Sequence, residues 1–184
     1  MNEFKVYEIS NAPSDSRVDL ETIKLNHGNI PNVYAVMAEA PVLLKGHIAL
    51  KEQFEKATLN KQDRKIVLLT LSRELGSAYD TAVHSGAAEK HSVPADVIEA
   101  IRAGNPLKDK KLESLRSFTV KLVNTRGHVT ESDVKDFLAA GYTRANVLEI
   151  VLAAGAVTLT SYTHLIAQPA LDAEFAAKVW KKAS

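Results

Sequence analysis

Apolar side chains recur every three or four positions along most of the chain, which is the spacing of a helix face turned toward a core. Strict alternation of apolar and polar residues is absent, apart from a candidate short strand at residues 4–9. The pattern predicts an all-α domain of about eight to ten helices. We expect helices at residues 17–25, 32–38, 42–56, 61–75, 79–90, 95–102, 107–124 and 130–141, in a long element after residue 143, and at residues 171–182.

Polar residues at the start of these segments support several of the boundaries. Asn60 is followed three positions later by Asp63, and Thr130 by Asp133, as in a capped helix start. Thr143 opens the last long element in the same way, and Gly76 is expected to end the helix at 61–75.

Residues 150–171 carry no formal charge over 22 positions, which is long enough for a membrane span. The second half of this stretch is rich in Ser, Thr, His and Gln, so we interpret it as a buried central helix. The first ten residues, MNEFKVYEIS, include Glu3 and Lys5 and have no apolar segment typical of a secretory signal. We expect a soluble, cytoplasmic protein without a membrane partner, forming one domain over residues 1–184.

Composition excludes several function classes. The chain has 23 basic and 22 acidic residues, a formal net charge of +1, and only 6% aromatic residues. A nucleic-acid-binding module usually shows a basic excess or aromatic stacking residues, so we expect no nucleic-acid partner. There is no cysteine, which excludes disulfides, thiol catalysis and thiolate metal sites.

The segment RELGSAYDTAVH, residues 73–84, holds the main candidate chemistry. If it is helical, Ser77, Asp80 and His84 fall at positions i, i+3 and i+7 and share one stripe. Asp80 and His84 are then close enough to hydrogen-bond, which would raise the pKa of the imidazole. The stripe fits a histidine base oriented by a carboxylate, half of a metal site, or a serine triad. It equally fits a non-catalytic Asp–His pair that links helices.

Two further residues are candidates for substrate contact. His164 lies on the polar continuation of the long C-terminal helix and is either a cavity residue facing His84 or a satisfied core histidine. Tyr79 precedes Asp80 and lies off the stripe, so it is either a core residue or a catalytic one.

Three segments together resemble the carboxymuconolactone decarboxylase and alkylhydroperoxidase (AhpD-like) family. They are IPNVYAVMAEAPVLLKGHIAL, the stretch from TLNKQDRKIVLLTLSREL to IEAI, and VLEIVLAAGAVTLTSYTHLIAQPALDAEF. The resemblance covers residues 30–175. It implies an AhpD-like helical domain assembled as a homo-oligomer (dimer, trimer or hexamer), with a small-molecule substrate or ligand and no cofactor.

The peroxidase branch of that family has a Cys-x-x-Cys motif followed by a histidine. In register, its cysteines fall on Ser77 and Asp80, its histidine on His84, and its upstream glutamate on Lys65. A serine hydroxyl has no accessible disulfide state, so thiol peroxidase activity is not expected. The decarboxylase branch instead has an aromatic residue, an acid and a histidine in this region. Tyr79, Asp80 and His84 resemble that set here.

The resemblance therefore implies lyase or hydrolase chemistry on a small lactone or carboxylic acid. His84, Asp80 and Ser77 would be catalytic, with Tyr79 and His164 in contact with substrate. One alternative is a non-catalytic family member that binds a small molecule or acts as a scaffold. A second is a peroxidase-type antioxidant role by family analogy, which without thiols would need a metal at Asp80 and His84.

Overall fold

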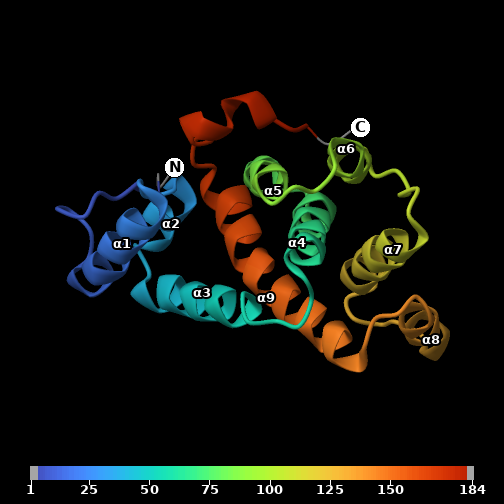
Figure 1. The fold of residues 1–184 in the computed structure, drawn as a ribbon. Helices are drawn as coiled ribbons and strands as arrows, with labels where there is room; N and C mark the ends of the chain where they lie inside the picture. The colour runs from blue at the N-terminus through green and yellow to red at the C-terminus, as the bar shows by residue number, and fades with distance from the viewer. Residues whose placement is uncertain (1–3, 182–184) are drawn as a thin grey trace.

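The structure is a computed structural model that describes residues 4–181. Over this range it has nine α-helices, one 3₁₀-helix and no strand, which confirms the all-α prediction (Figure 1). The elements are α1 (Ser14–His27), α2 (Asn32–Met37), α3 (Pro41–Phe54), α4 (Lys61–Leu75), α5 (Ala78–Lys90), α6 (Ala95–Ala103), α7 (Lys110–Asn124), α8 (Glu131–Ala139), α9 (Arg144–Ala167) and the 3₁₀-helix η1 (Ala173–Lys178).

Helix α4 lies at the centre of the molecule. It packs against α5, α6, α7 and α9, and most of its side chains are buried (Figure 1). Its start follows the expected capping pattern, because the Asn60 side chain accepts a hydrogen bond from the backbone N–H of Asp63 at 2.8 Å. Gly76 ends it with a backbone φ of 75°, a left-handed conformation that glycine adopts without strain.

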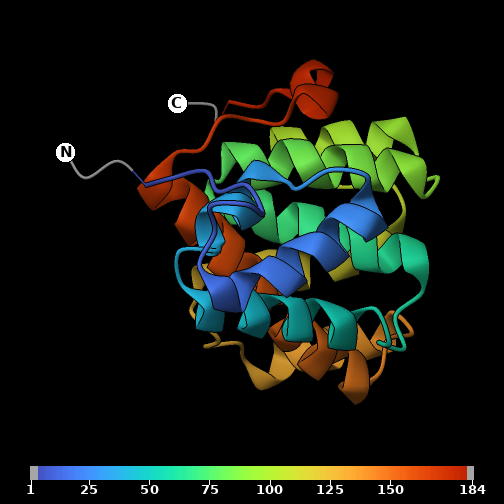
Figure 2. The same cartoon turned by 90° about the vertical axis from the view of Figure 1, so that its left-hand side faces the viewer.

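Two apolar clusters form the core. The larger one joins α4 to α6, α7, α8 and α9 and includes Ile66, Leu115 and Phe137. The smaller one joins α1, α2 and α3 and includes Leu20 and Leu44. Figure 2 shows α1 and α3 running side by side on one face of the molecule, where they contact each other. The helices that line the candidate site, α2 to α5 and α9, come from both clusters.

Three local predictions are corrected by the structure. Residues 4–9 are not a strand, because the backbone N–H of Tyr7 makes one hydrogen bond, to the Ala35 carbonyl at 3.3 Å, and no ladder follows. The helix expected from residue 107 begins at Lys110, because Asp109 caps it. The closing segment is a six-residue 3₁₀-helix rather than an α-helix.

Helix α9 is the one helix within residues 4–181 that is long and apolar enough to cross a membrane. Core helices of soluble proteins pass the same test of length and composition. Here α9 packs against α2, α3, α4, α5 and α7, so one of its faces is part of the core. The expectation of a buried helix therefore holds for one face of α9 only, since 33% of its apolar window is buried.

Candidate functional site

A cavity of about 360 Å³ lies between α2, α3, α4, α5 and α9, with η1 beside it. Most of its wall is apolar. Helices from both core clusters contribute, and the main apolar lining residues are Val33, Phe54, Leu68, Val83, Ala156 and Val157. A cavity of this size and character fits a small ligand with an apolar body.

The turn between α4 and α5 positions the candidate residues. Ser77 follows Gly76 and is the N-cap of α5, and its Oγ accepts a hydrogen bond from the backbone N–H of Asp80 at 3.1 Å. Asp80 and His84 both belong to α5 and both line the cavity. Ser77 is fully buried at the helix end and does not line the cavity, so it contacts Asp80 but is not available to a ligand there.

Asp80 is buried and is held by α9. Its Oδ2 accepts hydrogen bonds from Thr160 Oγ1 at 2.9 Å and from Ser161 Oγ at 2.6 Å. Burial raises the pKa of Asp80 to about 6, although hydrogen bonds from Ser161, Thr160 and Ser77 oppose this rise. The Asp80 carboxyl is therefore partly protonated near pH 6 and links α5 to α9.

His84 is half-buried and its ring faces the cavity. Within the described chain, residues 4–181, its ring nitrogens have no hydrogen-bond partner, so the expected bond to Asp80 is not formed. Burial and, to a smaller extent, the charges of Lys65 and Lys51 lower the pKa of His84 to about 3. The prediction that Asp80 raises the His84 pKa is wrong, because Asp80 binds the α9 hydroxyls instead.

His164 lies behind the start of α5. Its Nδ1 is 3.2 Å from Ser77 Oγ, and its ring centroid lies 5.6 Å from that of Tyr79. It is not among the cavity-lining residues. The structure thus brings His164 and Ser77 together, but does not place His164 beside His84.

Tyr79 is buried and forms part of the cavity wall. Its hydroxyl donates a hydrogen bond to Asp172 and lies 3.3 Å from the backbone N–H of Val33, from which it accepts. Asp172 also accepts from the backbone N–H of Asn32 at 3.0 Å. Burial and Asp172 raise the pKa of Tyr79. Because its hydroxyl is used within the protein, Tyr79 can offer a ligand its ring.

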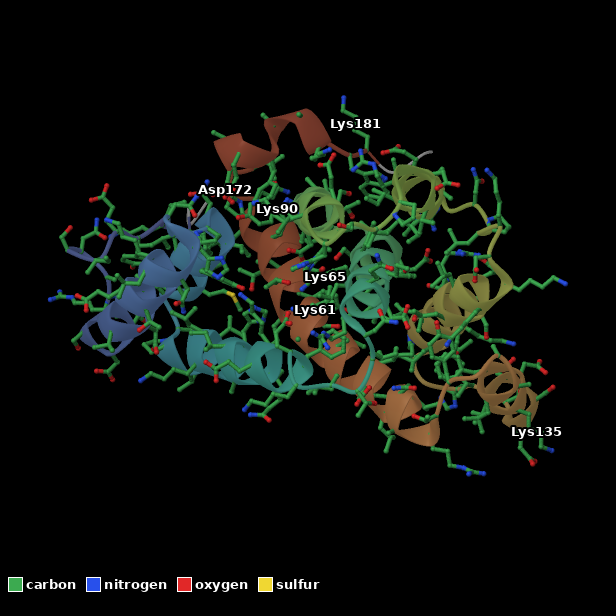
Figure 3. All side chains as sticks on the ribbon, in the orientation of Figure 1. Lys61, Lys65, Lys90, Lys135, Asp172 and Lys181 are labelled. Carbon is green, nitrogen blue, oxygen red and sulfur yellow. The ribbon has the colours of Figure 1, made fainter. Side chains whose placement is uncertain are left out.

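Two lysines in the cavity wall were not predicted as site residues. Lys65 on α4 is buried and donates a hydrogen bond to Glu55 Oε1 at 3.0 Å. Lys51 on α3 is half-buried, and its Nζ lies 3.1 Å from His27 Nε2. Figure 3 shows Lys65 near the middle of the molecule, whereas Lys135 and Lys181 lie at its edge.

His47 is a third basic residue of the wall. Its Nδ1 lies 3.2 Å from the Ala156 carbonyl and its Nε2 lies 3.0 Å from the Tyr34 hydroxyl. A carbonyl can only accept, so Nδ1 donates and Nε2 accepts from Tyr34. Burial lowers the pKa of His47 to about 4, so the ring is neutral at pH 7.

The sequence contained a signal for this basic wall. Leu44, His47, Lys51 and Phe54 are spaced by three, four and three positions, which places all four on one helix face. Leu44, His47 and Phe54 are buried and Lys51 is half-buried. A histidine and a lysine in register with apolar residues indicate a polar group facing an interior space.

No group of three or more His, Asp and Glu side chains between residues 4 and 181 has an arrangement that could hold a metal ion. Asp80 and His84 lie on one helix, as a metal pair would, but Asp80 is already bonded to two hydroxyl groups. The side chains present thus offer a proton acceptor and a proton donor in an apolar cavity.

No protein-family model and no curated protein matches the sequence. Several solved structures share the fold over almost the whole chain. An uncharacterized peroxidase-related protein with an alkylhydroperoxidase AhpD core, from Ralstonia eutropha JMP134, is 19% identical with a TM-score of 0.83, and the match covers 94% of this chain and 93% of that one.

Two further structures match over a similar length. The apo form of the debrominase Bmp8 is 15% identical with a TM-score of 0.77, covering 97% of this chain and 96% of that one. An uncharacterized peroxidase-related protein from Silicibacter sp. TM1040 is 17% identical with the same TM-score, covering 94% and 91%. At these identities the likeness shows the fold, which is AhpD-like.

Proposed function

We propose that this protein of AhpD-like fold is a cofactor-free enzyme of acid–base chemistry, a lyase or hydrolase that acts on a small lactone or carboxylic acid. The observation that carries the proposal is His84, an imidazole with unpartnered ring nitrogens that faces a largely apolar cavity. Its lowered pKa keeps the ring neutral at pH 7 but weakens it as a base, so a group bound beside it must raise this pKa for the ring to accept a proton from a substrate.

Asp80 is the complementary group in this proposal. It lines the same cavity, and its pKa of about 6 allows it to hold a proton that His84 cannot hold. Two titratable groups whose surroundings drive their pKa values in opposite directions are typical of an acid and a base in one site. Ser77 and His164 lie outside the cavity and act indirectly. Ser77 caps α5, and its hydroxyl contacts the His164 ring.

A thiol-dependent reaction has no residue to carry it, since the sequence contains no cysteine. The names of the structural neighbours include a debrominase and peroxidase-related proteins, and a thiol-dependent form of either activity requires a sulfur nucleophile. The proposal uses only proton transfer. We further propose that the protein is cytoplasmic and that it forms a homo-oligomer.

The test combines binding and turnover. A panel of small lactones, keto acids and aromatic acids is screened by thermal shift, because a ligand at 100 times its dissociation constant stabilises by about 2.7 kcal/mol. Each compound that shifts the melting temperature is then followed by NMR for conversion. We expect wild-type protein to convert at least one, and His84→Gln to bind it but convert it at least about 100-fold more slowly.

His128→Gln is the matched control, because His128 is exposed and lies outside the cavity. It should leave conversion unchanged. Equal conversion by wild-type and His84→Gln protein would refute the acid–base role. A compound that binds without being converted would favour the second candidate function, a non-catalytic binding protein, which the same well-formed cavity supports.

A further inference from the structure

Lys51 has no carboxylate partner in the structure. Its Nζ lies 3.1 Å from the Nε2 atom of His27 and 5.6 Å from the centre of the Tyr34 ring. Over residues 4–181, no Asp or Glu oxygen lies within ion-pair distance of it. Glu52 and Glu55 are near enough to act on its charge but do not bond to it. The amine is half-buried and faces the cavity.

The acids that line the cavity already have partners. Glu55 interacts with both Lys65 at 3.0 Å and Arg64 at 3.4 Å, so one carboxylate serves two cations. Asp80 is bonded to the α9 hydroxyls, and Glu174 lies by Lys90 at 3.9 Å. Around Lys51, the cavity wall therefore has two lysines, Lys51 and Lys65, and one carboxylate, Glu55, which is already paired.

Positive charge in a partly enclosed, mostly apolar space is costly unless an anion accompanies it. The charges of Lys51 and Lys65 also extend to His84, whose pKa both of them lower. The position between the two lysines is thus the place in the cavity where a negative group would be bound best. The apolar walls formed by Phe54, Leu68 and Val157 continue from there.

We propose that Lys51, with Lys65 beside it, forms a carboxylate-binding subsite, and that the ligand is a small monocarboxylate with an apolar body. This inference rests on the proposed function and narrows it. It selects an ionised carboxylic acid, rather than a neutral lactone, as the substrate. The bound carboxylate offsets the two lysine charges that suppress protonation of His84. The substrate's own charge then raises the basicity of the group that accepts its proton.

The test uses a pair of probes of nearly equal shape, 4-ethylbenzoate and 4-ethylbenzamide, which differ in charge at pH 7.5. Calorimetry is used to measure their dissociation constants. Wild-type protein should bind the benzoate at least about tenfold more tightly than the benzamide, since a hydrogen bond to a charged group is stronger than one to a neutral group. In Lys51→Met this preference should fall to less than about threefold, with benzamide affinity unchanged.

Lys45→Met is the matched control, because Lys45 is an exposed residue of the same helix that does not line the cavity. It loses the same charge and should keep the full preference for benzoate. Circular dichroism of each variant establishes that α3 is intact.

Each other outcome overturns the subsite. Equal binding of the two probes by wild-type protein leaves the cavity as a ligand site and refutes the carboxylate preference. A preference that persists in Lys51→Met assigns it to another residue. A Lys51 adduct trapped by borohydride with an aromatic keto acid would show that the amine is a nucleophile instead. Binding of neither probe at millimolar concentration would refute both the subsite and the proposed cavity function.

Discussion

At the scale of single residues, the environment of His84 makes stability depend on pH. Its pKa is about 3 in the folded protein and about 6.5 when unfolded, so the folded state favours the neutral ring. The stabilisation is complete above pH 6.5 and is lost as the pH falls toward 3. From pH 7.5 to pH 5.0, His84 alone should lower the free energy of unfolding by about 2 kcal/mol.

Urea unfolding at pH 7.5 and pH 5.0 measures this effect. We expect His84→Gln to lose about 2 kcal/mol less than wild type between the two pH values. His128→Gln, at an exposed position, should behave like wild type. Equal acid sensitivity of wild type and His84→Gln would mean that the ring is solvated and that its pKa is ordinary.

The residue-scale error in the sequence-based interpretation has a physical cause. Spacing along a helix shows that Asp80 and His84 can meet, but not what else competes for the carboxylate. Thr160 and Ser161 reach Asp80 from a helix 80 residues away in sequence, and both donate hydrogen bonds to its Oδ2. Local spacing cannot show such a partner, whereas the identity of His84 as a cavity residue could be predicted.

At the scale of elements, helix boundaries were predictable where a side chain specifies them. The capped starts at Asn60, Thr130 and Thr143 are all observed, and α4 has the predicted bounds. The last element was not predictable, because η1 has no side-chain cap and no buried residue of its own. Its position depends on contacts with α5 and with Arg102 that only the folded chain creates.

The contact between η1 and α5 gives an element-scale prediction. A Cβ on Gly86 would lie 3.0 Å from the ring of Phe175, a residue of η1 that lines the cavity. Gly86→Ala should therefore displace Phe175 while α5 keeps its structure. Alanine favours the helix by up to about 1 kcal/mol, which offsets the lost contact, so we expect little change in melting temperature.

Hydrogen exchange measured by mass spectrometry tests this expectation. Exchange at residues 173–178 should become faster in Gly86→Ala, while the rest of α5 stays protected. Gly46→Ala is the control, because a Cβ there meets nothing within 4 Å, and it should not affect η1. Unchanged exchange at residues 173–178 in Gly86→Ala would show that Phe175 does not hold η1 on α5.

At the scale of the whole molecule, α9 belongs to the core on one side and is open on the other. The all-α architecture and the core position of α9 could be predicted, because apolar residues recur at helical spacing and Ser, Thr, His and Gln interrupt the second half of its charge-free stretch. The exposure of its second face could not be predicted from the sequence. The helix has apolar side chains on all sides, so their periodicity does not show which side the rest of the protein covers. The exposed apolar residues on α9 are Leu148, Val151, Tyr162, Leu165 and Ile166.

This face gives a physical reason to expect the homo-oligomer that the family resemblance implies. Its exposed apolar residues fall on one side of the helix when they are placed at 100° per residue, and Gly155 in the middle of that side has open space where a side chain would project. A stripe of this kind matches a second copy of itself when two helices cross at the glycine, as in an isologous interface.

We expect the wild-type chain to have the mass of a dimer or larger assembly in light scattering coupled to gel filtration. Leu148→Glu with Ile166→Glu should reduce it to a monomer, whereas Val18→Glu, at an exposed apolar residue of α1, should not. A wild-type monomer at all concentrations, or an unchanged mass in the double variant, would refute this interface.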